Sequence, residues 1–350
     1  MERIPVYADI ENLIEIFSTD PSSSHFQGMK QFITKESKII INDTEENLTV
    51  SGYLEHIAKE LTSGDVQYDY VNENEASYLQ PTFKTNIQER FENKSSVLFS
   101  VDTARITLAK ESNGTLMSGI TEEHLVYNQL NFNKDFFRAS KILTIGKEFT
   151  NYISLKDHVL PFTEIIINEP YLFVPERKDF NLKRYLDNNF IALADVLFSN
   201  TKNKVNIVIC TFINEHNQHE SEWYDADTKS FKTLYEYIKD YLTGKLGGAR
   251  YKLWLIISPQ AHNARHDRYI LTNYQYLECG AGLTYFDDRG SFINRGEALH
   301  LYSIMHDEAR KSLLPTIINK IQTKVIDSLK ASKPDRIFGA EQGDSHFLNF

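Results

Sequence analysis

The feature that most constrains the fold is an alternation of short apolar runs with segments of helical periodicity. In RIPVYADIENLIEIFS, an apolar run that predicts a strand ends at Asp9, and apolar residues then recur at the spacing of a helix. The same order follows in SKIIIND (37–43) with a helix predicted over 48–64, and in SSVLFSVDTARITLAKESNG (95–114). Strands that alternate with helices are typical of α/β domains built on a parallel sheet.

The second half of the chain repeats this alternation. We predict a strand followed by a proline-marked turn over 162–176, strands over 204–214 and 251–258, two more strands within 266–286, and helices over 180–200, 230–248 and 312–332. Residues 115–155 show no clear period, so we place a domain boundary near residue 150. The prediction is an α/β protein with an acidic domain over residues 1–150, a second α/β domain over 151–335 and a polar tail over 336–350.

Charge and composition exclude several classes of protein. The net charge of -10, with its acidic excess in the first half, argues against nonspecific binding of nucleic acid through the whole surface. The longest apolar runs, VNIVICTFI and LWLIIS, are far shorter than the ~18 residues of a membrane span, and the N-terminus lacks the apolar core of a signal peptide. Two cysteines are too few for a disulfide framework. We therefore expect a cytoplasmic protein with no transmembrane segment.

A resemblance to a known family is carried by five segments of the second half. TEIIINEPYLF, VNIVICTF, YKLWLIIS, HDRYILTN and GAGLTYF, in this order, resemble the phospholipase D-like domain that follows microtubule-interacting-and-transport (MIT) domains, and its bacterial relatives, over roughly residues 155–300. Active phospholipase D-like enzymes use two sets of His, Lys and Asp. One imidazole attacks phosphorus, the other protonates the leaving oxygen, and the cations stabilise charge on the phosphate. The resemblance places His266, Arg268 and Asn273 at the His, Lys and Asp positions.

This chain has Arg268 and Asn273 where the active enzymes have Lys and Asp, and these two differences leave two interpretations of the second domain open. Arginine still binds a phosphate, but asparagine cannot place a negative charge beside the histidine. No second His-x-Lys/Arg appears in the chain, so a phosphodiesterase would need His266 from each subunit of a homodimer. The eukaryotic relatives are regarded as noncatalytic and are implicated in membrane-lipid binding and self-association. That comparison favours binding of a phosphate-bearing ligand, or oligomerisation, with Gly280 and Gly282 forming a tight turn.

The first half resembles, more faintly, PIN-like nucleases. In that pattern, acids at strand ends and one helical glutamate gather around a divalent metal, and the matching residues are Asp9, Glu55 and Asp102, with Glu122 or Glu123 as a fourth acid. Such carboxylates hold Mg²⁺ or Mn²⁺, which activates water. Acids at these positions also cap the helices that follow, so a structural role is the alternative.

Three hypotheses about function follow from these patterns. The first is an effector directed at nucleic acid, as in bacterial antiviral defence, with a metal-dependent nuclease in the first domain and a phosphate-binding or dimerising second domain. The second is a phospholipase D-like phosphodiesterase that uses His266 across a dimer. The third is a noncatalytic protein that binds a ligand, a second copy or a partner protein.

Overall fold

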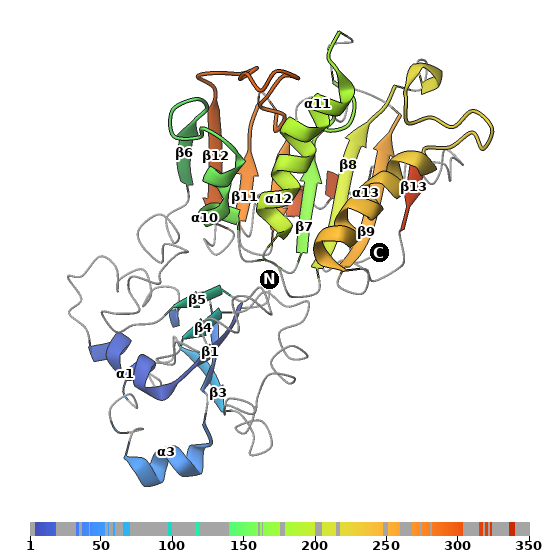
Figure 1. The fold of residues 1–350 in the computed structure, drawn as a ribbon. Helices are drawn as coiled ribbons and strands as arrows, with labels where there is room; N and C mark the ends of the chain where they lie inside the picture. Colours follow the sequence, from blue (N-terminus) through green and yellow to red (C-terminus); the bar gives the residue numbers. More distant parts are fainter. Residues whose placement is uncertain are drawn as a thin grey trace. The chain divides into compact units, whose positions relative to one another are not determined.

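The computed structural model describes residues 4–18, 33–34, 37–41, 43–52, 55, 59, 66–70, 97–99, 116–118, 140–159, 162, 164–175, 179–199, 205–214, 218–247, 251–259, 268–272, 275–280, 282–303, 315–317, 319–320, 323 and 336–339 (Figure 1). The chain divides into two units. Residues 1–140 form the first, together with 161–163 and 303–311, and the second comprises 141–160, 164–302 and 312–350.

The first unit contains a five-stranded sheet in which all neighbouring strands are parallel. The strand order is β3-β2-β1-β4-β5, with β1 (Ile4–Ala8), β2 (Ser37–Ile41), β3 (Gln67–Tyr70), β4 (Val97–Phe99) and β5 (Leu116–Ser118). The chain therefore adds β2 and β3 on one side of β1 and then β4 and β5 on the other. This reversal makes the carboxyl ends of β1 and β4 a topological switch point, where open α/β sheets place their ligands.

Apolar side chains of β1, β2 and the helix α1 (Ile10–Ser18) form the core of this unit. Val6 and Ala8 of β1, Ile39 and Ile41 of β2, and Leu13 of α1 are all fully buried. The predicted strand that ends at Asp9 and the helix that follows it are confirmed, because the apolar periods of the sequence match the faces that the sheet and the helix bury.

The helix predicted over 48–64 starts earlier than predicted and is interrupted at Gly52; beyond that glycine, Glu55 and Lys59 are helical and the other residues of the range lie outside the described part of the chain. Helix α3 spans Glu45–Ser51, and its N-cap residue Thr44 accepts a hydrogen bond from the backbone N–H of Asn47. Gly52 ends the helix with a φ of 74°, a left-handed conformation that glycine adopts at little cost. The sequence pattern missed this end because apolar residues continue at helical spacing on both sides of Gly52.

The second unit contains an eight-stranded mixed sheet of order β13-β9-β8-β7-β10-β11-β12-β6. Its strands are β6 (Ser140–Thr144), β7 (Glu164–Asn168), β8 (Val205–Phe212), β9 (Tyr251–Ser258), β10 (Tyr269–Thr272), β11 (Gln275–Glu278), β12 (Ala298–Ser303) and β13 (Ile337–Phe338). β7, β8 and β9 are parallel, whereas β10 runs antiparallel to both β7 and β11. The central strands are buried along nearly their whole length, which explains why the sequence showed them as continuous apolar runs.

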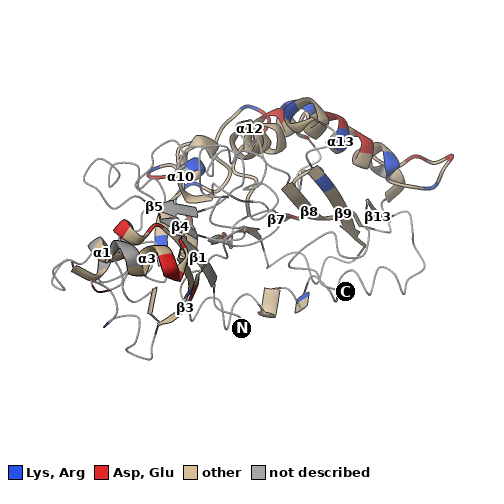
Figure 2. Ribbon diagram, turned by 90° about the horizontal axis from the view of Figure 1, so that it is seen from below, with Lys and Arg blue, Asp and Glu red and all other residues tan. Residues whose placement is uncertain are grey.

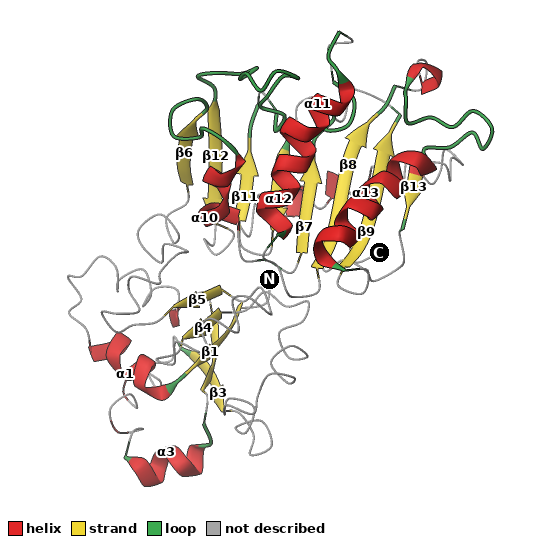
Figure 3. Ribbon diagram, in the orientation of Figure 1, coloured by secondary structure: helices red, strands yellow, loops and turns green. Residues whose placement is uncertain are grey.

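Helices cover one face of this sheet, as Figures 1 and 3 show. They are α10 (Lys156–Val159), α11 (Leu182–Leu186), α12 (Ala192–Phe198) and α13 (Lys232–Leu246). A π-helical turn, η4 (Asp187–Ile191), joins α11 to α12 without interruption, and a 3₁₀ turn, η3 (Tyr152–Leu155), precedes α10. The helices predicted over 180–200 and 230–248 are therefore confirmed, and the fold is α/β.

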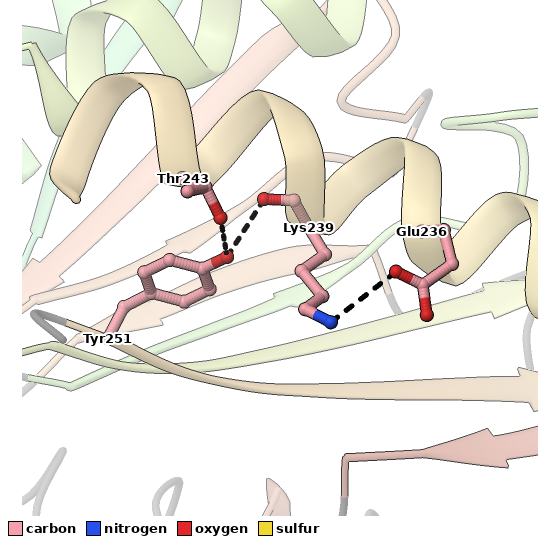
Figure 4. A network of polar contacts seen from close by, with 4 residues as sticks. All are labelled: Glu236, Lys239, Thr243 and Tyr251. Carbon is pink, nitrogen blue, oxygen red and sulfur yellow. Dashed lines mark hydrogen bonds and ion pairs between the residues drawn. The ribbon is translucent and has the colours of Figure 1, made fainter. Parts of the chain in front are cut away.

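Helix α13 is fixed to the start of β9 by the contacts drawn in Figure 4. The hydroxyl of Tyr251 lies 2.7 Å from Thr243 Oγ1 and donates to the carbonyl of Lys239 at 2.8 Å. The Lys239 ammonium in turn lies 3.4 Å from a carboxylate oxygen of Glu236, an exposed pair three residues apart on the helix. Leu234, Ile238, Leu242 and Leu246 occupy the buried face of the same helix.

The two edge strands of the large sheet come from opposite ends of the unit. β6 forms one edge, within the interval 115–155 for which the sequence showed no period. β13 forms the other and pairs antiparallel with β9. The fully buried Arg336 precedes β13 and donates to the carbonyl of Ile213 at 3.1 Å and to Gln218 Oε1 at 2.7 Å. These contacts anchor Arg336 at the start of β13.

Across the helices that the structure describes, none combines the length and the apolar character needed to cross a membrane.

Candidate functional site

The carboxyl end of β7 brings together residues from distant parts of the second unit. β10 is antiparallel to β7, with Tyr269 opposite Asn168. The residue that precedes β10, Arg268, therefore lies at the same edge of the sheet as the residue that follows β7, Glu169. The sheet thus places a cation and an acid side by side, although 99 positions of sequence separate them.

Glu169 is a fully buried acid held by backbone donors. Its Oε1 accepts a hydrogen bond from the N–H of Tyr171 at 3.0 Å, and its Oε2 accepts a short hydrogen bond from the N–H of Leu283. Burial raises the pKa of Glu169, while the bond from Leu283, the charge of Arg268 and the bond from Tyr171 act in the opposite direction. The carboxyl group therefore keeps its proton to a higher pH than an exposed glutamate does.

Arg268 is held against an aromatic ring at this edge. Its guanidinium carbon lies 5.3 Å from the centre of the Tyr171 ring, within the range of a cation–π contact. Its carbonyl accepts from the N–H of Cys279 at 3.1 Å, which fixes the backbone at the start of the β10–β11 hairpin. The Nε atom of Arg268 is buried and has no hydrogen-bond partner among the described residues. A buried N–H without an acceptor is costly, so this atom would gain from an oxyanion ligand.

Gly282 provides the space in which the arginine and the acid meet. Its φ is 109°, and a Cβ atom placed there would lie 2.8 Å from Nη1 of Arg268 and 3.3 Å from Oε2 of Glu169. The prediction that Gly282 permits a tight backbone conformation is therefore confirmed. Gly280, which was assigned the same role, is exposed, has no atom within 4 Å of the Cβ position and is not among the residues with positive φ.

Gly282→Ala is expected to destabilise the protein by about 2 kcal/mol, because the substitution combines an unfavourable φ with a contact against Arg268. Gly280→Ala is the matched control, and its free energy of unfolding should stay within about 0.5 kcal/mol of the parent. Urea denaturation of both variants measures the difference. Equal stability of the two would show that the close approach at Gly282 imposes no constraint.

Buried side chains fix the position of the segment 282–286. The hydroxyl of Tyr152 donates to the carbonyl of Leu283 at 2.8 Å. Asn189, in the π-helical turn, accepts from the N–H of Phe286 at 3.1 Å and donates to its carbonyl at 2.7 Å. With the bond from Leu283 to Glu169, these contacts fix the segment that carries Gly282 and so the position of Arg268.

The structure tests the residues predicted from the phospholipase D-like resemblance only in part. Arg268 lies at the edge just described, while His266 and Asn273 lie outside the described residues. Glu169 was missed, although an acid directly after the apolar run IIIN is the same signal that singled out Asp9. In the segment 282–286, Leu283 and Tyr285 are fully buried, whereas Phe286 is half-buried.

The residues predicted from the nuclease resemblance lie in the first unit. Asp9 follows β1 directly and is buried, at the carboxyl end of the central strand. β1 pairs with β4 in parallel, with Ala8 opposite Phe99, so the strands preceding Asp9 and Asp102 are neighbours. Asp102 itself, like Glu122 and Glu123, lies outside the described residues. Glu55 is exposed and follows the glycine that ends α3.

Acidic side chains mark the helices of this unit, as the red segments on α1 and α3 in Figure 2 show. They include Glu11, Glu45 and Glu46, each in the first turn of its helix, where a negative charge interacts favourably with the helix dipole. Within the described residues, no three His, Cys, Asp or Glu side chains are arranged to hold a metal ion. Among the predicted ligands, Asp9 is therefore the one whose described position supports a site at the switch point.

Comparison of the sequence with models of protein families gave no match, and comparison with curated proteins gave none either.

Proposed function

We propose that the second unit binds a phosphate-bearing ligand through Arg268, and that it serves as the recognition module of a protein directed at nucleic acid. The observation that carries the proposal is the buried Nε of Arg268, which has no acceptor among the described residues. A phosphate oxygen is a suitable acceptor, because arginine matches its geometry with two parallel donors. Stacking on Tyr171 orients the guanidinium before any ligand arrives, which reduces the entropy lost on binding.

The site favours binding over phosphodiester cleavage. The position that the phospholipase D-like pattern fills with aspartate is Asn273 in this chain, and an amide cannot compensate the charge of an imidazolium. The acid near Arg268 is instead Glu169, which accepts hydrogen bonds from two backbone N–H groups. These bonds occupy its oxygens, so Glu169 fits the role of a residue that positions Arg268.

Arg268→Ala is expected to weaken the binding of inorganic phosphate and of a short single-stranded oligonucleotide by about tenfold or more. This is the loss of affinity expected from the removal of one hydrogen bond to a charged group. Isothermal titration in EDTA measures both ligands. Arg268→Lys should recover part of the affinity, because it keeps the charge and loses the planar fork. Arg184→Ala, at an exposed arginine of α11, is the matched control and should bind as the parent does.

Two results would contradict this proposal. Equal affinities for the parent and Arg268→Ala would exclude Arg268 as the anion site. Cleavage of the oligonucleotide that persists in EDTA and disappears in His266→Ala would replace binding with phospholipase D-like catalysis, and would require a dimer to supply the second histidine.

We infer a second function, metal-dependent cleavage of nucleic acid, for the first unit. The observation that favours it is the strand order, because it puts the buried Asp9 at a topological switch point beside β4. A carboxylate at this position suits Mg²⁺ or Mn²⁺, with Asp102 proposed as the second ligand; Glu55 is exposed. A bound ion would supply an activated water molecule, and Asp9 would hold and orient that ion.

A further inference from the structure

Glu169 and Arg268 share a single space at the edge of the large sheet. Nη1 of Arg268 and Oε2 of Glu169 lie 2.8 Å and 3.3 Å from the same point, the Cβ position that Gly282 leaves empty. The arginine also interacts electrostatically with the carboxyl group. An anion that reaches Arg268 therefore comes within a short distance of Glu169, and the two negative charges would repel each other through a buried region of low dielectric constant.

The groups that surround Glu169 favour its neutral form once an anion is present. Besides Arg268, the titratable groups that the structure places around it include Tyr152 and Tyr285, both buried, Cys279 beside Tyr285, and Tyr171, whose ring lies against Arg268. Burial raises the pKa of Tyr152 and Tyr285, so they carry no charge near neutral pH. Arg268 is thus the one cation among these groups, and an anion that pairs with it removes the charge that helps Glu169 to ionise.

Tyr285 adds a further polar group to the buried cluster. The hydroxyl of Tyr285 is fully buried and has no hydrogen-bond partner among the described residues. It interacts electrostatically with Glu169. A protonated Glu169 donates one hydrogen bond that a carboxylate cannot, and a buried hydroxyl oxygen without a partner is stabilised by receiving it.

We propose that anion binding at Arg268 is coupled to protonation of Glu169, so that Glu169 makes the recognition site stronger at low pH. This inference rests on the proposed function of Arg268. With Glu169 ionised, its negative charge attracts the guanidinium and repels the incoming anion. With Glu169 neutral, the guanidinium is available to the ligand. Affinity is therefore highest at acidic pH and falls as pH rises through the titration of Glu169 in the complex.

Sulfate is the probe for this coupling, because its charge is constant between about pH 5.5 and 8, unlike that of inorganic phosphate. We expect the affinity of the protein for sulfate to fall about tenfold over this interval, and that of Glu169→Gln to change less than about twofold. The measurement is made in a His266→Gln background, so that this imidazole contributes no titration of its own. Isothermal titration at a series of pH values gives the dissociation constants.

Two further variants separate coupling from a purely structural role. Glu148→Gln is the matched control. Its carboxyl is exposed, and its pKa is lowered to about 2, mainly by hydrogen bonds with Thr144. The group is therefore ionised throughout the interval, and the variant should keep the parent's pH dependence. Glu169→Asp keeps a titrating group on a shorter side chain and should retain the pH dependence with a displaced midpoint. This variant is informative even if Glu169→Gln fails to fold.

The outcomes distinguish the inference from the function on which it rests. If the His266→Gln parent binds sulfate and Glu169→Gln keeps the same pH dependence, or Glu169→Asp leaves the midpoint unchanged, the coupling is overturned and the anion site stands. If the parent does not bind sulfate at any pH, both the anion site and the coupling are overturned. A flat pH profile in Glu169→Gln, with a preserved profile in Glu148→Gln, supports both.

Discussion

Asn189→Leu is expected to lower the free energy of unfolding by about 4 kcal/mol, the largest loss of stability that we predict for a single side chain. Asn189 is fully buried: Nδ2 donates to the carbonyls of Tyr185 and Phe286, and Oδ1 accepts from the N–H of Phe286 and shares the single hydroxyl hydrogen of Tyr152 with the carbonyl of Leu283. Leucine has a similar volume and makes none of these hydrogen bonds. The substitution leaves both backbone groups of Phe286 without these partners, and each unpaired group costs about 1–3 kcal/mol.

The neighbouring residue offers a matched control for this prediction. Asn188 is half-buried and donates one hydrogen bond, to the carbonyl of Asp287 at 2.9 Å. Asn188→Leu should therefore cost less than about 1 kcal/mol. Urea denaturation compares the two variants, and similar losses would show that the segment 282–286 does not depend on Asn189. Because this segment positions Arg268, Asn189→Leu should also weaken phosphate binding under conditions in which the variant remains folded.

Asp9→Asn is expected to reduce Mn²⁺-dependent cleavage of single-stranded nucleic acid by about a hundredfold or more, if the first unit acts as we propose. Asparagine preserves the size of the side chain and removes the charge that would hold the ion. Mn²⁺ binding measured by titration in the absence of nucleic acid gives a second readout, and the variant should bind the ion more weakly. His266→Ala should leave this metal-dependent cleavage unchanged, since the two residues belong to different units.

Asp69→Asn serves as the control for the loss of an acid from the same sheet. Asp69 lies on the edge strand β3 and pairs with Lys38 at 3.3 Å, with both side chains largely exposed. Such a pair contributes little to stability, and Asp69 lies two strands away from β1. Cleavage that is equally fast in the parent, Asp9→Asn and Asp69→Asn would exclude the switch point as the site of the chemistry.

The parts of the fold that the sequence predicted are those governed by local pattern. β8 and β9 are buried on both faces, so an uninterrupted apolar run was enough to locate them. Helix α13 has leucine and isoleucine at every fourth position and ends at Gly247, and both signals are visible in the sequence. Asp9 was assigned to a strand end because the apolar run of β1 stops there.

The parts that the sequence did not predict depend on contacts between distant residues. β6 is an edge strand of five residues with Ile142 exposed, so it shows neither a buried run nor a clean alternation. Glu169 is significant because its carboxylate reaches Leu283, 114 positions away, and no local pattern reveals that contact. Asn188 and Asn189 are identical in type, and only the packing of the π-helical turn against the segment 282–286 decides which of them is buried.

The positions of the edge strands in the sequence affect how the second unit folds during synthesis. β9 is a strongly apolar strand, and the neighbour that covers its outer edge, β13, is encoded about 80 residues later. During synthesis at roughly 5–20 residues per second, this edge stays open for several seconds after β9 has left the ribosome. A nascent chain that pauses in this interval presents an unpaired apolar strand to its neighbours. We therefore expect the nascent chain to be most prone to aggregation between the emergence of β9 and the emergence of Arg336.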